Sequence, residues 1–166
     1  MTLPREAQLL GATSSDLAVK GSGADTVVRL SPDSQRRLTA LISRASAEEH
    51  VGNVYLGLEN IRGTFDATVL NTYINLPEGA RPVDHRNLMA ESAGLYGLRR
   101  ASVVHGENAG PGLTFLLEIT GILTELFASH SLNTEEIRVS IVPDRPLPDQ
   151  TTITIGRVSI FTVPAT

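Results

Sequence analysis

Apolar and polar residues alternate with a period of two over much of the chain after residue 51. Four segments show this alternation clearly, and they cover residues 54–58, 70–76, 113–119 and 137–141. Such a pattern predicts strands with one buried face, and Gly, Pro and Asn residues mark the turns between them. With the segment 151–161, at least five strands are expected, interrupted by only one short helical stretch. The pattern therefore favours a mainly β fold, an antiparallel β-sandwich, over a parallel sheet.

The last predicted strand changes its buried face part of the way along. Ile153 and Ile155 share one parity, whereas Val158 and Ile160 share the other, with Gly156 between the two pairs. A glycine at a change of parity is the signature of a β-bulge, which adds one residue to a strand and re-aims those that follow. We therefore predict a bulge at Gly156, in the bent closing strand of a curved sheet.

Two segments have the periodicity of helices. An N-terminal helix is predicted over about residues 32–47, with Ser31 as its N-cap and Pro32 at its first position. A short helix is predicted over residues 120–127, with Thr120 as its cap, and is expected to close one end of the sandwich. The apolar stripes are Leu38, Leu41, Ile42 and Ala45 in the first helix and Ile122, Leu123, Leu126 and Phe127 in the second.

The start of the chain differs in composition from the rest. Residues 1–25 are mostly small or polar, and the run GSGAD at 21–25 indicates a turn or linker before a short strand at 26–30. We therefore expect a leader or linker over residues 1–25 and a single β-sandwich domain over residues 26–166, which includes the first helix. A chain of 166 residues is long enough for one domain with a buried core.

The composition argues against several classes of protein. The 14 basic and 18 acidic residues leave a net charge of -4, and no basic run indicates nucleic acid or an anionic membrane as a partner. The absence of Cys excludes disulfides, thiolate metal ligands and a Cys nucleophile. No apolar run reaches the roughly 20 residues of a membrane helix, and no signal-peptide pattern opens the chain. The cellular compartment stays unknown.

No motif for catalysis or metal binding is found. The four histidines are isolated, since none is three or four residues from another, the spacing that would aim two imidazoles at one metal ion from a helix. The sequence contains no G-x-S-x-G elbow, no phosphate-binding loop and no H-E-x-x-H. The residues alone therefore predict a non-catalytic β-domain without a cofactor or metal site.

The strand motifs resemble those of a known family in their order along the chain. They are VYLGLENIRGTFDATVLNTYINLP at 54–77, ESAGLYGL at 91–98, LTFLLEITGILTEL at 113–126, IRVSIVPDRP at 137–146 and ITIGRVSI at 153–160. Together they resemble the C-terminal domain of the tyrosinase and polyphenol oxidase family of type-3 copper proteins. The leader is similar to the segment that joins the copper domain to this domain in bacterial members.

The resemblance implies both a fold and a role. In that family the C-terminal domain is a jelly-roll-like sandwich, akin to the third domain of hemocyanins. A separate helical domain holds two coppers with six histidines and oxidises phenols or catechols to quinones. The C-terminal domain packs over the copper site and keeps a latent form inactive. Since the four histidines of this chain cannot supply such a site, the resemblance places copper in a partner catalytic domain, in cis or in trans.

The resemblance also points to residues that would block the entrance to the copper site. Our candidate is Tyr96, because its phenol could imitate a substrate and the flanking Gly94 and Gly97 allow close backbone approach. Leu95 and Leu98 are the alternatives for this role. The competing interpretation is that Tyr96 is a half-buried strand aromatic, a position that favours such side chains for packing alone.

Two further function classes stay open on sequence grounds. One is an independent ligand-binding module, since sandwiches often display binding loops. If the chain is such a module, the loops 78–92 and 99–112 are the expected binding loops. Their candidate ligand-binding residues are Asp84, His85, Arg99, Arg100 and His105. The other is a structural protein whose sheet edges pair with copies of itself.

Overall fold

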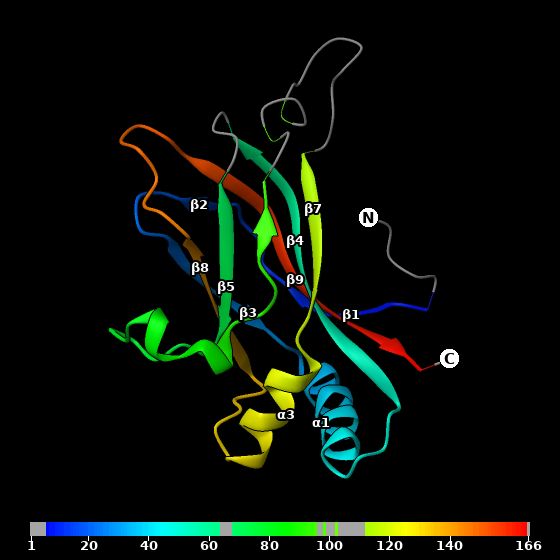
Figure 1. Ribbon diagram of the computed structural model, residues 1–166. Coiled ribbons are helices and arrows are strands. Elements are labelled where there is room, and N and C mark those ends of the chain that lie inside the picture. Colours follow the sequence, from blue (N-terminus) through cyan, green and yellow to red (C-terminus); the bar gives the residue numbers. More distant parts are fainter. Residues whose placement is uncertain (1–5, 64–67, 96–97, 99–101, 103–111, 166) are drawn as a thin grey trace.

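Two antiparallel sheets face each other, and two helices lie at one end of them (Figure 1). The computed structural model describes residues 6–63, 68–95, 98, 102 and 112–165. Within these residues the elements are those expected of a mainly β, sandwich-like fold, with an N-terminal helix and a second, short helix. The predicted fold class is confirmed.

The first sheet has five strands within the described residues. Its order is β1-β9-β4-β7, and β2 pairs with β9 beside β1. The bounds are Gln8–Ala12 for β1, Leu17–Val19 for β2, Gly52–Gly63 for β4, Leu113–Glu118 for β7 and Ile153–Pro164 for β9. The long strands β4 and β9 pair over their whole length and form the centre of this sheet.

The second sheet has four strands within the same described ranges, in the order β3-β8-β5-β6. Their bounds are Ala24–Arg29 for β3, Val69–Ile74 for β5, Ala93–Gly94 for β6 and Glu136–Pro143 for β8. Between β5 and β6 the chain makes two single-turn 3-10 helices, η1 (Pro82–Asp84) and η2 (Arg86–Leu88).

The core lies between the sheets and is built from the inward positions that the alternation predicted. Leu56 and Leu58 of β4 are fully buried, as are Ile74 of β5, Val139 and Ile141 of β8. At about 25 cal/mol per Å² of apolar surface removed from water, such side chains supply most of the driving force for folding.

The helices α1 (Pro32–Ser46) and α3 (Thr120–Ala128) pack against each other at one end of the sandwich (Figure 1). Ser31 caps α1 as predicted, because its side chain accepts a hydrogen bond from the Ser34 amide. The predicted cap of α3 is wrong: its N-cap is Ile119, and the Thr120 hydroxyl accepts a hydrogen bond from the Val54 amide at 2.8 Å. Thr120 thus ties α3 to β4. No helix among the described residues has the length and hydropathy needed to span a membrane.

The segment expected to be a leader differs from that expectation in the described residues. β1 and β2, both within residues 1–25, pair antiparallel with β9, and β3 begins at Ala24. Leu10 is 4% exposed and Val19 is fully buried, so each strand contributes to the core. These strands are only five and three residues long, and they become strands because β9 offers its edge. The predicted turn is present at Gly21 and Ser22, between β2 and β3, but Ala24 and Asp25 already belong to β3.

The kink in β9 is present, and β4 matches it. Val158 and Ile160 are buried with the opposite parity to Ile153 and Ile155, as predicted. Register between β4 and β9 nevertheless continues, because Asn60 stands opposite Gly156 and both strands change face together. Asn60 adopts a positive φ of 57°. The bulge predicted at Gly156 is therefore wrong as a break in the β4–β9 pairing; the register shifts between β4 and β7, where β4 has one extra residue between Leu58 and Ile61.

Gly156 is required at the kink by close approach rather than by its own backbone angle. A Cβ atom at this position would lie 2.9 Å from the Cβ of Asn60. That separation is below any ordinary contact between carbon atoms, which are at their best near 3.5–4.0 Å. The kink therefore needs a glycine facing Asn60, and the sequence signal at Gly156 has a tertiary cause.

Candidate functional site

The predicted entrance-blocking and loop-binding residues fall partly outside the described residues. Tyr96, Arg99, Arg100 and His105 lie outside them. Leu95 and Leu98, the alternatives to Tyr96, lie within them, and both side chains are fully buried. His85 follows η1 and is half-buried.

Leu95 and Leu98 attach the chain to β4 and to the start of β5. The Leu95 amide donates a hydrogen bond of 2.8 Å to the Thr68 carbonyl. The carbonyl of Leu98 accepts one of 2.6 Å from the Ser102 hydroxyl, which in turn accepts one from the Gly63 amide. Gly63 also leaves room for Leu98, since a Cβ there would lie 3.0 Å from its Cδ2. Both leucines therefore act as internal anchors on either side of Tyr96 in the sequence.

The described residues do not form a copper site. His50 and His130 are exposed, and among the described residues no group of three or more His, Cys, Asp or Glu side chains is placed to hold a metal ion. A dicopper centre needs several imidazoles converging on one cavity. The side chains that the structure describes do not fit copper, and no chemical step is assigned to copper within this chain.

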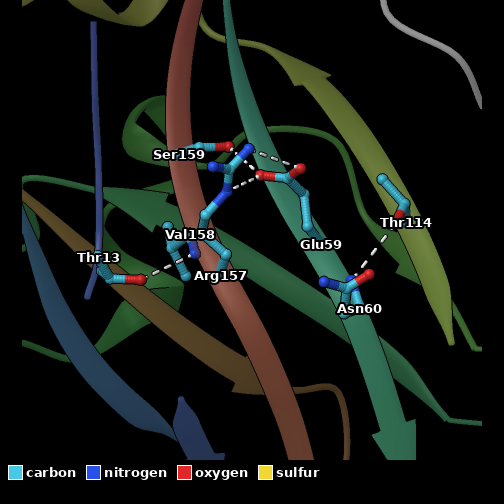
Figure 2. Close-up of polar contacts among 7 residues, drawn as sticks. All are labelled: Thr13, Glu59, Asn60, Thr114, Arg157, Val158 and Ser159. Carbon is cyan, nitrogen blue, oxygen red and sulfur yellow. Dashed lines mark hydrogen bonds and ion pairs between the residues drawn. The ribbon is translucent and has the colours of Figure 1, made fainter. Parts of the chain in front are cut away.

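The most developed polar cluster lies on the outer face of the five-stranded sheet, next to the kink (Figure 2). Glu59 of β4 and Arg157 of β9 are directly paired across the strands. Arg157 donates two hydrogen bonds to the carboxylate, from Nε to Oε2 at 2.7 Å and from Nη2 to Oε1 at 3.0 Å. The hydroxyl of Ser159, a fully buried residue, donates a third to Oε2 at 2.7 Å.

This cluster is partly shielded from water, which perturbs both charged groups. The side chain of Glu59 is 18% exposed and that of Arg157 is 39% exposed. Burial alone raises the pKa of Glu59, but the hydrogen bonds from Arg157 and Ser159 and the charge of Arg157 outweigh it, so the net pKa lies below its usual value. The hydrogen bond to Glu59 raises the pKa of Arg157, against burial and with the help of the Glu59 charge.

The arrangement suits bracing rather than proton transfer. A carboxylate with a lowered pKa and both oxygens engaged is a weak base, whereas a general base works best with a pKa near the working pH. Neighbouring contacts also hold the kink: the Val158 amide donates to the Thr13 hydroxyl at 3.0 Å, and the Asn60 amide donates to the Thr114 hydroxyl at 3.4 Å (Figure 2). No local pattern in the sequence indicates the Glu59–Arg157 pair, because its partners are 98 residues apart.

Comparisons with known proteins agree with the resemblance found in the strand motifs. The family model described as "Domain of unknown function (DUF7868)" matches residues 6–163. The tyrosinase HcTyr1 from Hahella sp. (strain CCB-MM4) is 25% identical over 152 residues, which cover 92% of this chain and 32% of that protein. The chain thus spans about a third of the length of this curated relative. The resemblance of the chain to part of a tyrosinase is confirmed.

Solved structures with a similar arrangement include two of latent aurone synthase, a polyphenol oxidase. The form from the natural source has a TM-score of 0.46 and 16% identity, with 99% of this chain and 27% of that chain covered. A recombinantly expressed form, co-crystallised with hexatungstotellurate(VI) and soaked in H2O2, has a TM-score of 0.45 and 15% identity, with coverage of 93% and 25%.

Proposed function

Since this chain belongs to the family described as "Domain of unknown function (DUF7868)", whose description states no activity, we propose a function from its similarity to part of a tyrosinase. It is the non-catalytic C-terminal domain of a tyrosinase-like copper oxidoreductase. In this role it covers the entrance to a dicopper site that is held by a separate catalytic domain, and so regulates the access of phenolic substrates.

The observation that carries the proposal is the partial match. Nearly the whole chain is similar to a tyrosinase, yet it covers only 32% of that protein. Tyrosinase chemistry needs copper, and the described residues gather no set of metal ligands. Coppers and their ligands therefore belong in the remaining part of such an enzyme. A compact sandwich without such ligands suits a covering or regulatory role.

Within this proposal Tyr96 is the side chain that blocks the entrance. A phenol resembles the substrates of the enzyme and can occupy the same opening without being released. Leu95 and Leu98 are unsuited to that role themselves, because both are fully buried in this chain. Their place is to anchor the segment on either side of Tyr96, through the contacts with Thr68, Gly63 and Ser102.

The proposed function can be tested on the natural gene product, isolated from its source. We expect a polypeptide longer than 166 residues, or a complex with a second subunit, that contains bound copper. We also expect its oxidation of catechol to rise when this domain is removed by limited proteolysis. We would measure the mass of the product by mass spectrometry, its copper content, and its rate of catechol oxidation before and after cleavage. A product that holds no copper, alone or with a co-purifying subunit, would contradict the proposal, as would a rate unaffected by cleavage.

Replacing Tyr96 by Ala in that uncleaved product is expected to raise its activity. A plug that keeps the site closed nine-tenths of the time lowers the rate about tenfold, so its loss restores about that factor. Catechol oxidation before proteolysis measures the effect, and Tyr96→Phe, which keeps the ring, is the matched control. If Tyr96→Ala leaves the rate at the wild-type level, Tyr96 does not block the entrance.

A further inference from the structure

A surface depression of about 660 Å³ lies between the outer side of the four-stranded sheet and the turns η1 and η2. Its lining combines apolar groups from Tyr73, Val83, Met89 and Val142 with charged groups from Arg81 and Arg86. The turns form because Pro82 starts η1, where its fixed φ suits the first helical position. Each turn closes with a backbone hydrogen bond back to its start, to the Pro82 and Arg86 carbonyls.

Two apolar side chains of the depression are unusually exposed. Val83 is 50% exposed and Met89 is 36% exposed, and they are two of the three large hydrophobic side chains exposed in the described part of the chain. Contiguous exposed apolar groups commonly mark contact surfaces, and Tyr, Met and Arg are enriched in protein interfaces. The composition of this depression therefore fits a protein contact.

The charged rim of the depression has an excess of positive charge. Arg86 makes no ion pair among the described residues, and Arg81 only approaches Asp84 at 4.0 Å, with both side chains mostly exposed. Such a surface pair contributes little. Of the described lining residues, Asp144 is the one carboxylate. Two guanidinium groups beside an apolar floor favour a partner that presents a carboxylate next to an apolar side chain.

The rest of this outer face is already internally paired. On β3 and β8, Arg29 contacts Glu136 at 2.6 Å and Arg138 contacts Asp25 at 3.5 Å. Ser140 donates a hydrogen bond to the same Asp25. These charges satisfy one another and leave little to attract a partner. The unmatched charge and the exposed apolar groups are thus concentrated at the depression.

The depression is continuous with the strip of chain that leads to the proposed plug. Met89 forms a bridge with Tyr73, and the Ala90 amide donates a hydrogen bond to the Thr72 carbonyl. Farther along, Gly94 pairs with Val69 in β6, and Leu95 immediately precedes Tyr96 in the sequence. The residues from Met89 to Gly94, which precede Tyr96 in the sequence, therefore run along the edge of β5 that also borders the depression.

We infer that this depression is a docking site for the dicopper catalytic part of the enzyme. The partner inserts an apolar side chain between Val83 and Met89 and sets a carboxylate against Arg81 and Arg86. This inference rests on the proposed function and adds to it the surface and the chemistry of the contact. Because the guanidinium groups are at a solvent-exposed rim, the attraction is weakened by salt.

The test uses the natural copper-containing product, cut between its two parts so that only non-covalent contact holds them together. Arg86→Glu and Met89→Ser are the test variants, and Arg36→Glu on α1 and Leu9→Ser on β1 are matched controls with exposed side chains. Circular dichroism and thermal unfolding check that every variant is folded. We expect each test variant to weaken association about tenfold, measured by dilution and size exclusion, with the controls unchanged.

The outcomes separate this inference from the proposed function. If the wild-type parts stay associated and the test variants behave like the controls, the docking site lies elsewhere and the inference is overturned. If the variants change only the oligomeric state of this chain in isolation, the depression is a contact between copies of this chain. That outcome also overturns the inference. If the wild-type parts separate freely and cleavage leaves the activity unchanged, the proposed function fails together with the inference.

Discussion

Leu58→Ala is expected to lower the free energy of unfolding by about 2–5 kcal/mol, the cost of a cavity in a well-packed core. Leu58 is fully buried at the centre of β4. It is paired with Phe115 of β7 on one side and with Val158 of β9 on the other. Its loss therefore loosens the middle of the five-stranded sheet. Urea-induced unfolding followed by circular dichroism gives the change.

Leu9→Ala is the matched control for this cavity. Leu9 belongs to β1 in the same sheet but is 46% exposed. Truncation at an exposed position is expected to change the free energy of unfolding by less than about 0.5 kcal/mol. If Leu58→Ala were as mild as Leu9→Ala, the two sheets would not share the tightly packed core described above.

Glu59→Gln is expected to lower the free energy of unfolding at neutral pH by about 1.5–3 kcal/mol, the contribution of hydrogen bonds to charged groups. The change removes the counter-ion of Arg157, whose side chain is only 39% exposed. It also weakens the acceptor for the buried Ser159 hydroxyl. Because the cluster joins β4 to β9 beside the kink, its loss acts where both strands change face. Thermal and urea unfolding measure the change.

The effect of Glu59→Gln should depend on pH in a defined direction. The pKa of Glu59 is lower in the folded chain than its usual value, so the unfolded state binds the proton more tightly. The carboxylate therefore contributes its full stability above the usual pKa, and this contribution is lost as the pH falls through the lowered, folded pKa. The wild-type chain should lose stability in acid, and its advantage over Glu59→Gln should shrink there.

Glu136→Gln provides the control for the acid dependence. Glu136 pairs with Arg29, but both side chains are well exposed, at 42% and 77%. A surface pair of this kind contributes about 0–1 kcal/mol. Unfolding curves recorded at a series of pH values compare the two variants. Equal losses for Glu136→Gln and Glu59→Gln at neutral pH would contradict a special role for the Glu59 cluster.

The candidate sites were only partly accessible to sequence analysis. The family resemblance pointed to Tyr96, Leu95 and Leu98. The structure then showed that both leucines are fully buried, so neither can act at the surface. For the depression beside η1 and η2, the sequence indicated only the loop 78–92 as a candidate binding segment. Its other wall comes from β5 and β8, which are far apart in the sequence. No pattern within one segment could bring Arg86 and Val142 together.

Sequence by itself determined the features that depend on near neighbours. The buried faces of β4, β5 and β8 follow from alternation, and α1 follows from Ser31, Pro32 and an apolar stripe. The parity change beside Gly156 can also be read along one strand, although the need for a glycine there comes from Asn60 of β4. The features read from the sequence have short-range causes, which are side-chain direction and capping.

Only the tertiary structure decided which strands become neighbours, and several features depend on that choice. β1 and β2 become strands because β9 offers them an edge. Thr120 binds the Val54 amide because α3 ends up beside β4. Glu59 meets Arg157 because β4 pairs with β9 in a register that keeps Asn60 opposite Gly156. Hydrogen bonding and packing between distant segments are properties of the assembled sandwich, so local patterns could not contain them.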